Sequence, residues 1–216
     1  MASLGNALFA TSRGALLPKP NSCYAQLAMK IYLAGPEVFL PNAREMLDRK
    51  AALARAAGFI PLSPGDLELP RSETRRDKAF AISAIDEQMM YEAHGVIANL
   101  TPYRGISADV GTAYEVGFMC ALGKPAYAYT NIARGHFQRQ VDYYGGRYTT
   151  DASGETRGPD GLTVDNFDMM DNLMLPGGIE RRGGVVVIGN APPESVDTDT
   201  KAFEECLRLM AAKYLR

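Results

Sequence analysis

Residues 95–130, GVIANLTPYRGISADVGTAYEVGFMCALGKPAYAYT, decide the fold of this chain. The apolar run at 95–100 predicts a buried strand, and 124–130 predicts another. Between them, 109–123 predicts a helix made mainly of small and apolar residues. A strand, a helix and a second strand in this order are typical of a parallel sheet flanked by helices.

The same alternation continues on both sides of this unit. Apolar runs predict strands within 30–40, 59–64 and 183–189. Apolar residues at helical spacing predict helices at 42–59, 79–94 and 200–216, and an amphipathic pattern restarts at 165–175. The polar and charged residues at 65–78 show no such period, and we expect a loop there.

This order of elements predicts an α/β fold of the flavodoxin-like, doubly wound class, with helices on both faces of a parallel sheet. Ligands in such folds lie beyond the carboxyl ends of the strands. We therefore expect the loops after 31–34, 96–100 and 126–130 to build a site. The Gly-, Arg- and Asp-rich segment 131–168 has little periodicity and is long for a loop, which suggests a cover over that site.

Composition limits the class of protein. The chain has 216 residues, 46% of them hydrophobic and 22% charged, which suits one domain, expected at 29–216. A net charge of −2 argues against a nucleic-acid partner, and no apolar run is long enough to predict a membrane span. The three cysteines, Cys23, Cys120 and Cys206, are far apart, so we expect reduced thiols and a cytoplasmic location.

The first 28 residues differ in composition from the rest. They carry Arg13 and Lys19, no acidic residue, and many small side chains. This pattern resembles an organelle-targeting presequence or an upstream start before Met29. We expect 1–28 to be a disordered extension without a catalytic role.

Glu115 is the unusual residue of the helix at 109–123. It has little polar company, and Gly111 lies four positions before it. Helical side chains lean toward the N-terminus, so Glu115 projects over position 111, where glycine leaves space. A carboxylate facing such a space suits a nucleophile or a general base; a solvated glutamate, with glycine used for close packing, is the alternative.

Each of the other candidate residues also has a structural explanation. Asp109 fits a helix N-cap. Asp86 lies beside the apolar stripe of its helix and fits a solvated position, and Tyr32 fits a core aromatic whose hydroxyl has a partner. Asn172 fits the start of a helix.

Four segments nevertheless share the order seen in one family. They are IYLAGPEVF from Ile31, Asp86 followed by HGVIANL, ADVGTAYEVGFMCALGKP from Ala108, and DNFDMMDNLML from Asp165. Together they resemble the nucleoside 2-deoxyribosyltransferases, from about residue 30 to 175. The most specific element is an acid six residues before a Glu-x-Gly, here Asp109, Gly111, Glu115 and Gly117.

This resemblance implies a role for each matching residue. Glu115 takes the position of the nucleophile, Asp86 of the acid that addresses and helps protonate the nucleobase, and Tyr32 of the residue that positions the nucleophile. Asp109 matches the acid that holds the sugar hydroxyls, with Gly35 and Gly111 beside the substrate. Asn172 and Met174 match residues that a neighbouring subunit donates, so we expect a homo-oligomer with shared sites.

The implied reaction exchanges 2-deoxyribose between nucleobases through a glutamyl ester. A carboxylate can stabilise the oxocarbenium-like state and capture the anomeric carbon, while an acid protonates the leaving base. The expected partners are deoxynucleosides and free nucleobases, and no metal or organic cofactor is needed.

Two other functions remain open. A related hydrolase removes the base from deoxynucleoside 5′-monophosphates. Asp109 argues against this function because its carboxylate would repel the phosphate, whereas the hydroxyl of Ser107, two residues earlier, could bind the phosphate and keeps the alternative open. A non-catalytic nucleoside-binding sensor is the other. In some members of the family, the terminal carboxylate of a short tail enters the sugar pocket; this chain departs from that pattern, because about 40 residues follow NLML.

Overall fold

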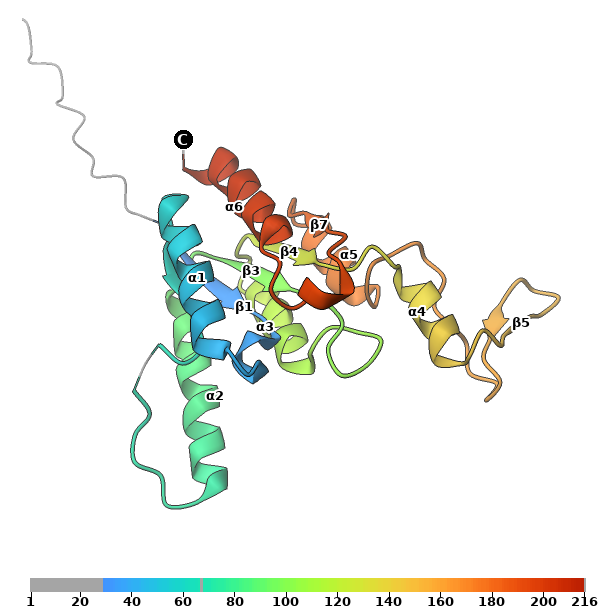
Figure 1. Ribbon diagram of the computed structural model, residues 1–216, viewed down its shortest axis with the longest axis horizontal. Coiled ribbons are helices and arrows are strands. Elements are labelled where there is room, and N and C mark those ends of the chain that lie inside the picture. Colours follow the sequence, from blue (N-terminus) through green and yellow to red (C-terminus); the bar gives the residue numbers. More distant parts are fainter. Residues whose placement is uncertain (1–28, 67, 216) are drawn as a thin grey trace, which may run out of the picture.

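A parallel five-stranded sheet forms the centre of the molecule, and it confirms the predicted flavodoxin-like class (Figure 1). The computed structural model describes residues 29–66 and 68–215, so the predicted extension at 1–28 lies outside the described residues. The strand order is β2-β1-β3-β4-β7, and every neighbouring pair is parallel. The strands are β1 (Lys30–Ala34), β2 (Ile60–Leu62), β3 (Gly95–Asn99), β4 (Ala126–Thr130) and β7 (Val186–Ile188).

Helices cover both faces of this sheet. One face packs against α2 (Arg75–Glu92), α3 (Val110–Ala121) and α5 (Met174–Glu180) through a core that includes Val96, Val116 and Met119. The other packs against α1 (Ala43–Ala56) and α6 (Lys201–Tyr214) around Ile97 and Phe203. Short 3-10 turns, η1 (Pro36–Phe39) and η2 (Pro193–Ser195), complete the sheet domain.

The helix α2 begins four positions before the predicted residue 79. Thr74 and Asp77 form a reciprocal capping box: the Thr74 side chain accepts from the Asp77 N–H, and the Asp77 carboxylate accepts from the Thr74 N–H. The charged residues assigned to a loop therefore form the first turn of α2. Apolar periodicity missed this turn because the turn is solvent-exposed on every side.

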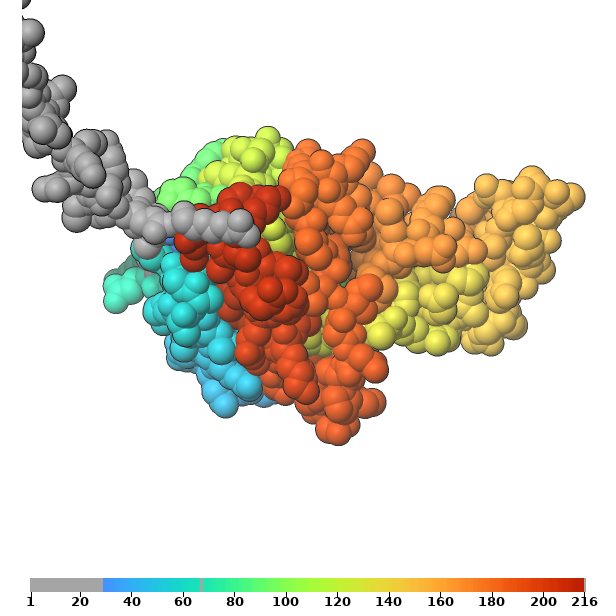
Figure 2. All heavy atoms as spheres, turned by 90° about the horizontal axis from the view of Figure 1, so that it is seen from above, coloured from blue at the N-terminus to red at the C-terminus, as the bar shows by residue number. Residues whose placement is uncertain are grey.

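The segment after β4 differs most from its prediction. It contains α4 (His136–Tyr143) and the antiparallel pair β5 (Thr149–Thr150) and β6 (Thr156–Arg157). We call residues 132–173 the arm, because this segment extends away from the sheet (Figures 1 and 2). Local turns and hydrogen bonds hold the arm together, such as that from the Tyr144 hydroxyl to Asp160. Contacts of this kind do not require apolar residues at regular spacing, so a search for periodicity does not detect them.

None of the helices in the described part of the chain has the length and apolar content required to cross a bilayer.

Candidate functional site

A cavity of about 640 Å³ opens beyond the carboxyl ends of β1 and β3, where the fold class predicts a ligand site. Its walls come from four segments: the turn after β1, the loop after β2, the middle of α2 and the first turns of α3. The lining residues are Gly35, Val38, Phe39, Pro64, Gly65, Leu69, Ile82, Ile85, Asp86, Asp109, Gly111, Thr112 and Glu115.

The loops that build the cavity differ in part from the prediction. The loops after 31–34 and 96–100 contribute, as expected, but the loop after 126–130 does not. The strand β4 continues into the arm, which leads away from the cavity, and no arm residue lines it. The predicted cover at 131–168 is therefore not a cover over the site of its own chain.

Tyr32 and Glu115 meet at the cavity. The Tyr32 hydroxyl, on β1, donates a 2.7 Å hydrogen bond to Oε1 of Glu115 on α3. Tyr32 is fully buried, and burial raises its pKa far above the ordinary value, so its hydroxyl stays protonated and can donate to the Glu115 carboxylate. Tyr32 thus fits both the core aromatic and the positioning residue of the sequence analysis.

The carboxyl of Glu115 is strongly perturbed. Burial raises its pKa to about 8, and the nearby charges of Asp86, Asp109 and Glu37 act in the same direction. The hydrogen bond from Tyr32 opposes this shift by stabilising the anion. Glu115 is therefore not a solvated surface glutamate, and a shifted pKa in a cavity is typical of a functional carboxyl.

Asp86 also lies in the cavity wall rather than in solvent. It is partly buried on α2, and desolvation raises its pKa to about 6. Ile82, which belongs to the apolar stripe of the same helix, is 40% exposed and lines the cavity. The apolar stripe of α2 therefore forms a wall of the cavity beside a carboxyl whose pKa lies about one unit below neutral pH.

Asp109 combines its two expected roles. Its Oδ2 atom caps α3 by accepting from the Thr112 N–H at 3.1 Å, and the residue also lines the cavity. Capping occupies one carboxylate oxygen, so Oδ1 is left for a ligand. A Cβ atom at Gly111 would lie 2.9 Å from Oδ2, so glycine there leaves room for the cap as well as space near Glu115.

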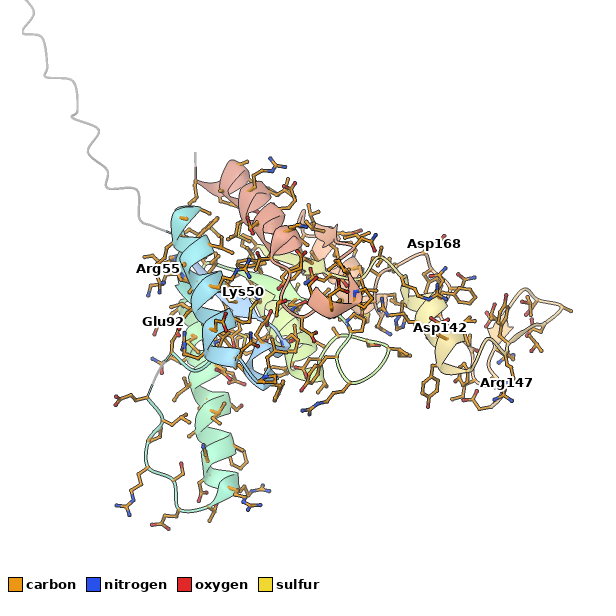
Figure 3. The ribbon with its side chains drawn as sticks, in the orientation of Figure 1. Lys50, Arg55, Glu92, Asp142, Arg147 and Asp168 are labelled. Atoms are coloured by element: carbon orange, nitrogen blue, oxygen red, sulfur yellow. The ribbon has the colours of Figure 1, made fainter. Side chains whose placement is uncertain are left out.

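Gly35 shapes the turn that carries Val38 and Phe39 into the cavity. A Cβ atom at Gly35 would lie 2.0 Å from Oε2 of Glu37, so only glycine fits. The Glu37 carboxylate is buried and accepts from Lys50 Nζ at 2.7 Å, from Asn99 Nδ2 at 2.8 Å and from the Tyr129 hydroxyl at 3.1 Å. This network anchors the turn against α1, β3 and β4; the lysine lies on α1 (Figure 3).

A second hollow of about 320 Å³ reaches the same carboxyls from the side of α2 and α3. It shares Ile82, Asp86, Gly111 and Glu115 with the main cavity. Its outer wall includes Tyr114, which is 55% exposed. The site of a single chain is therefore open on two sides.

Asn172 and Met174 are not part of this site in their own chain. Both are exposed at the start of α5, and neither lines the cavity. Asn172 Oδ1 accepts from the Met174 N–H at 3.1 Å, which agrees with the alternative of a helix start. The site brings together Tyr32, Gly35, Asp86, Asp109, Gly111 and Glu115 from the sequence candidates.

The sequence analysis did not identify the apolar walls. Val38 and Phe39 lie in η1, the turn after the first strand, so their place near a carboxyl strand end was the available signal. Pro64, Gly65 and Leu69 belong to the charged loop after β2, where no pattern distinguished them.

Within residues 29–66 and 68–215, no three His, Cys, Asp or Glu side chains are grouped in a way that could hold a metal ion. The polar groups of the cavity are instead carboxyls with a tyrosine donor, among apolar walls. This arrangement suits a flat apolar ring with polar edges, a small polyol, and proton transfer between them.

Comparisons with known proteins agree with this geometry. The model of one family, described as nucleoside 2-deoxyribosyltransferase, matches residues 31–174. A Schizosaccharomyces pombe protein named only as uncharacterized is 32% identical over 186 residues, covering 79% of this chain and 86% of its own. The solved structure of a 2-deoxyribosyltransferase from Leishmania mexicana is 32% identical, with a TM-score of 0.52, and covers 68% of this chain and 85% of that chain.

A conserved protein from Enterococcus faecalis shares the fold. It is 18% identical, with a TM-score of 0.50, and the match covers 84% of this chain and 98% of that one.

Proposed function

Because this chain belongs to the nucleoside 2-deoxyribosyltransferase family, we propose that it exchanges the 2-deoxyribose of a deoxynucleoside between nucleobases through a covalent ester on Glu115. The observation that carries this proposal is the 2.7 Å hydrogen bond from Tyr32 to Glu115 at a cavity that also contains Asp86 and Asp109. A positioned carboxylate and a second carboxyl with a raised pKa are the two groups that retaining glycosyl transfer needs.

In the first half of the reaction, an oxygen of ionised Glu115 bonds to the anomeric carbon. The bond between that carbon and the base nitrogen breaks, and the base leaves with the electron pair. Asp86 gives the leaving nitrogen its proton, which avoids expulsion of a poor anionic leaving group. Tyr32 holds the Glu115 carboxylate in position, and Asp109 binds sugar hydroxyls that do not react.

In the second half, a nitrogen of the incoming base attacks the same carbon and displaces the Glu115 carboxylate. The proton of that nitrogen passes to ionised Asp86, which restores the starting state. Two displacements at one carbon retain its configuration. Val38, Phe39, Leu69 and Ile82 supply apolar walls for either base.

The site is completed by a second copy of the chain. The hollow between α2 and α3 leaves Glu115 open at the side, and Phe80, Tyr91 and Tyr114 are exposed on these two helices. Met174 is 66% exposed next to Asn172, outside the cavity of its own chain. A neighbour that places its Asn172 and Met174 in this hollow would bury apolar surface and exclude water from the ester.

The test is base exchange in purified protein. Deoxyinosine with adenine should yield deoxyadenosine and hypoxanthine, and chromatography detects both products. A second reaction, of thymidine with adenine, then shows whether pyrimidine nucleosides are also accepted. Glu115→Ala should abolish exchange, and a 2-fluoro-2-deoxy nucleoside should leave its sugar on Glu115, detected by peptide mass spectrometry. A sugar found on another residue contradicts the mechanism.

The same assay separates the two alternatives. Asp109 in the cavity wall disfavours a phosphate dianion, so deoxyinosine should be preferred over its 5′-monophosphate. Hydrolysis of the monophosphate without an acceptor base would instead identify the related hydrolase. Binding of deoxyinosine without any turnover would identify a sensor.

A further inference from the structure

Asp171 connects two residues of the proposed site, although it lines no part of the cavity. Its Oδ2 atom accepts a 2.9 Å hydrogen bond from the Ala108 N–H, and its Oδ1 atom accepts a 2.7 Å hydrogen bond from the Asn172 N–H. Ala108 directly precedes Asp109 in the chain. One buried carboxylate therefore holds the backbone next to Asp109 and the backbone of Asn172.

Arg139 completes this arrangement from α4, at the base of the arm. Its Nη2 atom lies 3.3 Å from Asp171 Oδ2, and their side chains are only 8% and 0% exposed. Its Nε atom donates to the Ile106 carbonyl at 2.7 Å, and other guanidinium hydrogens bond the Arg134 and Met170 carbonyls at 2.7 Å each. The guanidinium thus ties the arm to the β3–α3 loop.

The loop held in this way delivers Asp109 to the cavity. It runs from the end of β3 to Asp109. The arm holds it at two backbone groups, the Ile106 carbonyl, which Arg139 contacts, and the Ala108 N–H, which Asp171 contacts. A loop of this length has many alternative conformations in the absence of such contacts. Together with the N-cap bond from the Thr112 N–H, these contacts set where the Asp109 carboxylate stands relative to Glu115.

We propose that Asp171 and Arg139 are positioning residues for the sugar site, which fix Asp109 in its own subunit and Asn172 toward the neighbour through one buried ion pair. This inference rests on the proposed function. It gives the arm a part in the reaction even though the arm does not line the cavity, because movement of the arm at α4 would move Asp109.

A purely structural ion pair would affect the amount of folded protein but not substrate binding in particular. Asp171→Asn distinguishes the two roles, because an amide has one acceptor oxygen and cannot accept from both Ala108 and Asn172. The matched control is Asp142→Asn, which removes an ion pair with Arg134 in the same arm, on an exposed side chain away from the loop.

The experiment measures kcat and KM for deoxyinosine with adenine. Sugar hydroxyls do not react, so a displaced Asp109 weakens substrate and transition state equally and raises KM. Asp171→Asn should raise KM about 10-fold, the effect of one lost charge-assisted hydrogen bond, and change kcat less than about 3-fold. Asp142→Asn should leave both constants unchanged.

A double-variant comparison shows whether Asp171 acts through Asp109. If it does, Asp171→Asn should raise KM by less than about 2-fold when Asp109→Ala is already present. An equal rise of KM in both backgrounds, or an unchanged KM in Asp171→Asn alone, overturns the proposal. If Asp171→Asn does not fold, Arg139→Lys is the second variant, because it keeps the positive charge but loses the guanidinium hydrogen bond to the Ile106 carbonyl. It should raise KM in the same way, and by less when Asp109→Ala is already present.

Hydrogen exchange of the peptide 105–112 separates this inference from the proposed function. Faster exchange there in Asp171→Asn than in Asp142→Asn supports the inference, and equal exchange overturns it, whether or not the protein catalyses base exchange. A wild-type protein without base exchange overturns the proposed function alone.

Discussion

The Tyr32 hydroxyl donates a 2.7 Å hydrogen bond to Oε1 of Glu115, and 83 positions of sequence separate the two residues. The pairing joins the strand β1 to the helix α3 at the carboxyl edge of the sheet. It stabilises the ionised form of a carboxyl whose burial favours the protonated form. The balance of these two effects decides at which pH Glu115 is ionised, as its proposed role of nucleophile requires, and five predictions test this and related features.

Tyr32→Phe should lower kcat for base exchange about 10-fold and change KM little, because one hydrogen bond to the nucleophile is lost while the cavity keeps its shape. The loss also raises the pKa of Glu115 further, so the alkaline side of the pH profile should move above pH 8. Steady-state kinetics between pH 5 and pH 10 check both effects. A profile that stays unchanged would contradict the assigned role of Tyr32.

The pH dependence of kcat/KM should be bell-shaped. Asp86, with a pKa of about 6, and Glu115, with a pKa of about 8, share one proton between these limits. The proposed reaction needs ionised Glu115 and protonated Asp86, which is the less populated of the two singly protonated arrangements because the pKa of Glu115 is the higher. The pair as a whole holds one proton between about pH 6 and pH 8, so the optimum lies near about pH 7. In Asp86→Asn the rate should fall about 10²–10⁴-fold and rise as Glu115 ionises, below pH 8 because the charge of Asp86 no longer raises the Glu115 pKa, without the alkaline decline.

Glu115→Gln should stabilise the fold at alkaline pH. The pKa of Glu115 is raised by folding, from 4.5 to about 8, so the folded state keeps a proton that the unfolded state releases. The stabilisation that Glu115 gives the folded state is complete below about pH 4.5 and is lost as the pH rises through 8. At pH 9 we expect a gain of about 1–2 kcal/mol, or about 2–8 °C in Tm, and little gain at pH 4.

Calorimetry at the two pH values measures this effect. Glu45→Gln, on the exposed part of α1, is the control and should change Tm equally at both. A Glu115→Gln variant that loses stability at pH 9 would show that Glu115 is ionised in the folded protein without cost.

Lys50→Met should destabilise the fold by about 3–5 kcal/mol, because it leaves the Glu37 carboxylate buried without its cation. The ammonium also lies 4.8 Å from the centre of the Phe203 ring. Adding Glu37→Gln to Lys50→Met should recover most of the loss, since no buried charge then remains. Urea unfolding measures both variants.

The exposed pair of Lys30 and Glu92 gives the matched control, because it spans a similar distance of 3.3 Å in solvent. Glu92→Gln should cost less than about 1 kcal/mol. Equal costs for the buried and the exposed pair would contradict the role given to burial.

Gly111→Ala should raise KM for the deoxynucleoside about 10-fold with little change in Tm, because the lost N-cap of α3 and the helix propensity of alanine oppose each other. The new Cβ atom would lie 2.9 Å from Asp109 Oδ2 and would displace that carboxylate, whereas alanine itself favours the helix. Gly117→Ala, on the same helix, meets no heavy atom within 4 Å and serves as the control with unchanged KM. Similar kinetics for the two variants would contradict a sugar site at Asp109.

Several parts of the fold were predictable because their signals are local. The helices at 42–59, 109–123 and 200–216 and the central strands follow from apolar periodicity, and the structure confirms them. The order of these elements then predicts a parallel sheet, and the carboxyl edge of that sheet predicts where the cavity lies.

Other parts could not be predicted because their contacts are not periodic. The first turn of α2 depends on a reciprocal side-chain cap, and the arm depends on turns and on Arg139, whose partners lie 5 to 33 positions away. The loop after β2 contributes Leu69 to the cavity, and nothing in the sequence distinguishes Leu69 from the other residues of that loop, because its role depends on which residues lie near it in the folded chain.

The sequence by itself determined the strands of the sheet and the main helices that flank it, their order, and which residue types are available for chemistry at Glu115, Asp109 and Asp86. Only the tertiary structure decided that these carboxyls share one cavity, that Tyr32 reaches Glu115, and that Asn172 faces away from its own site. Periodicity reflects the local backbone. A raised pKa and a pairing across 83 residues arise from burial and contacts that exist only once the chain has folded.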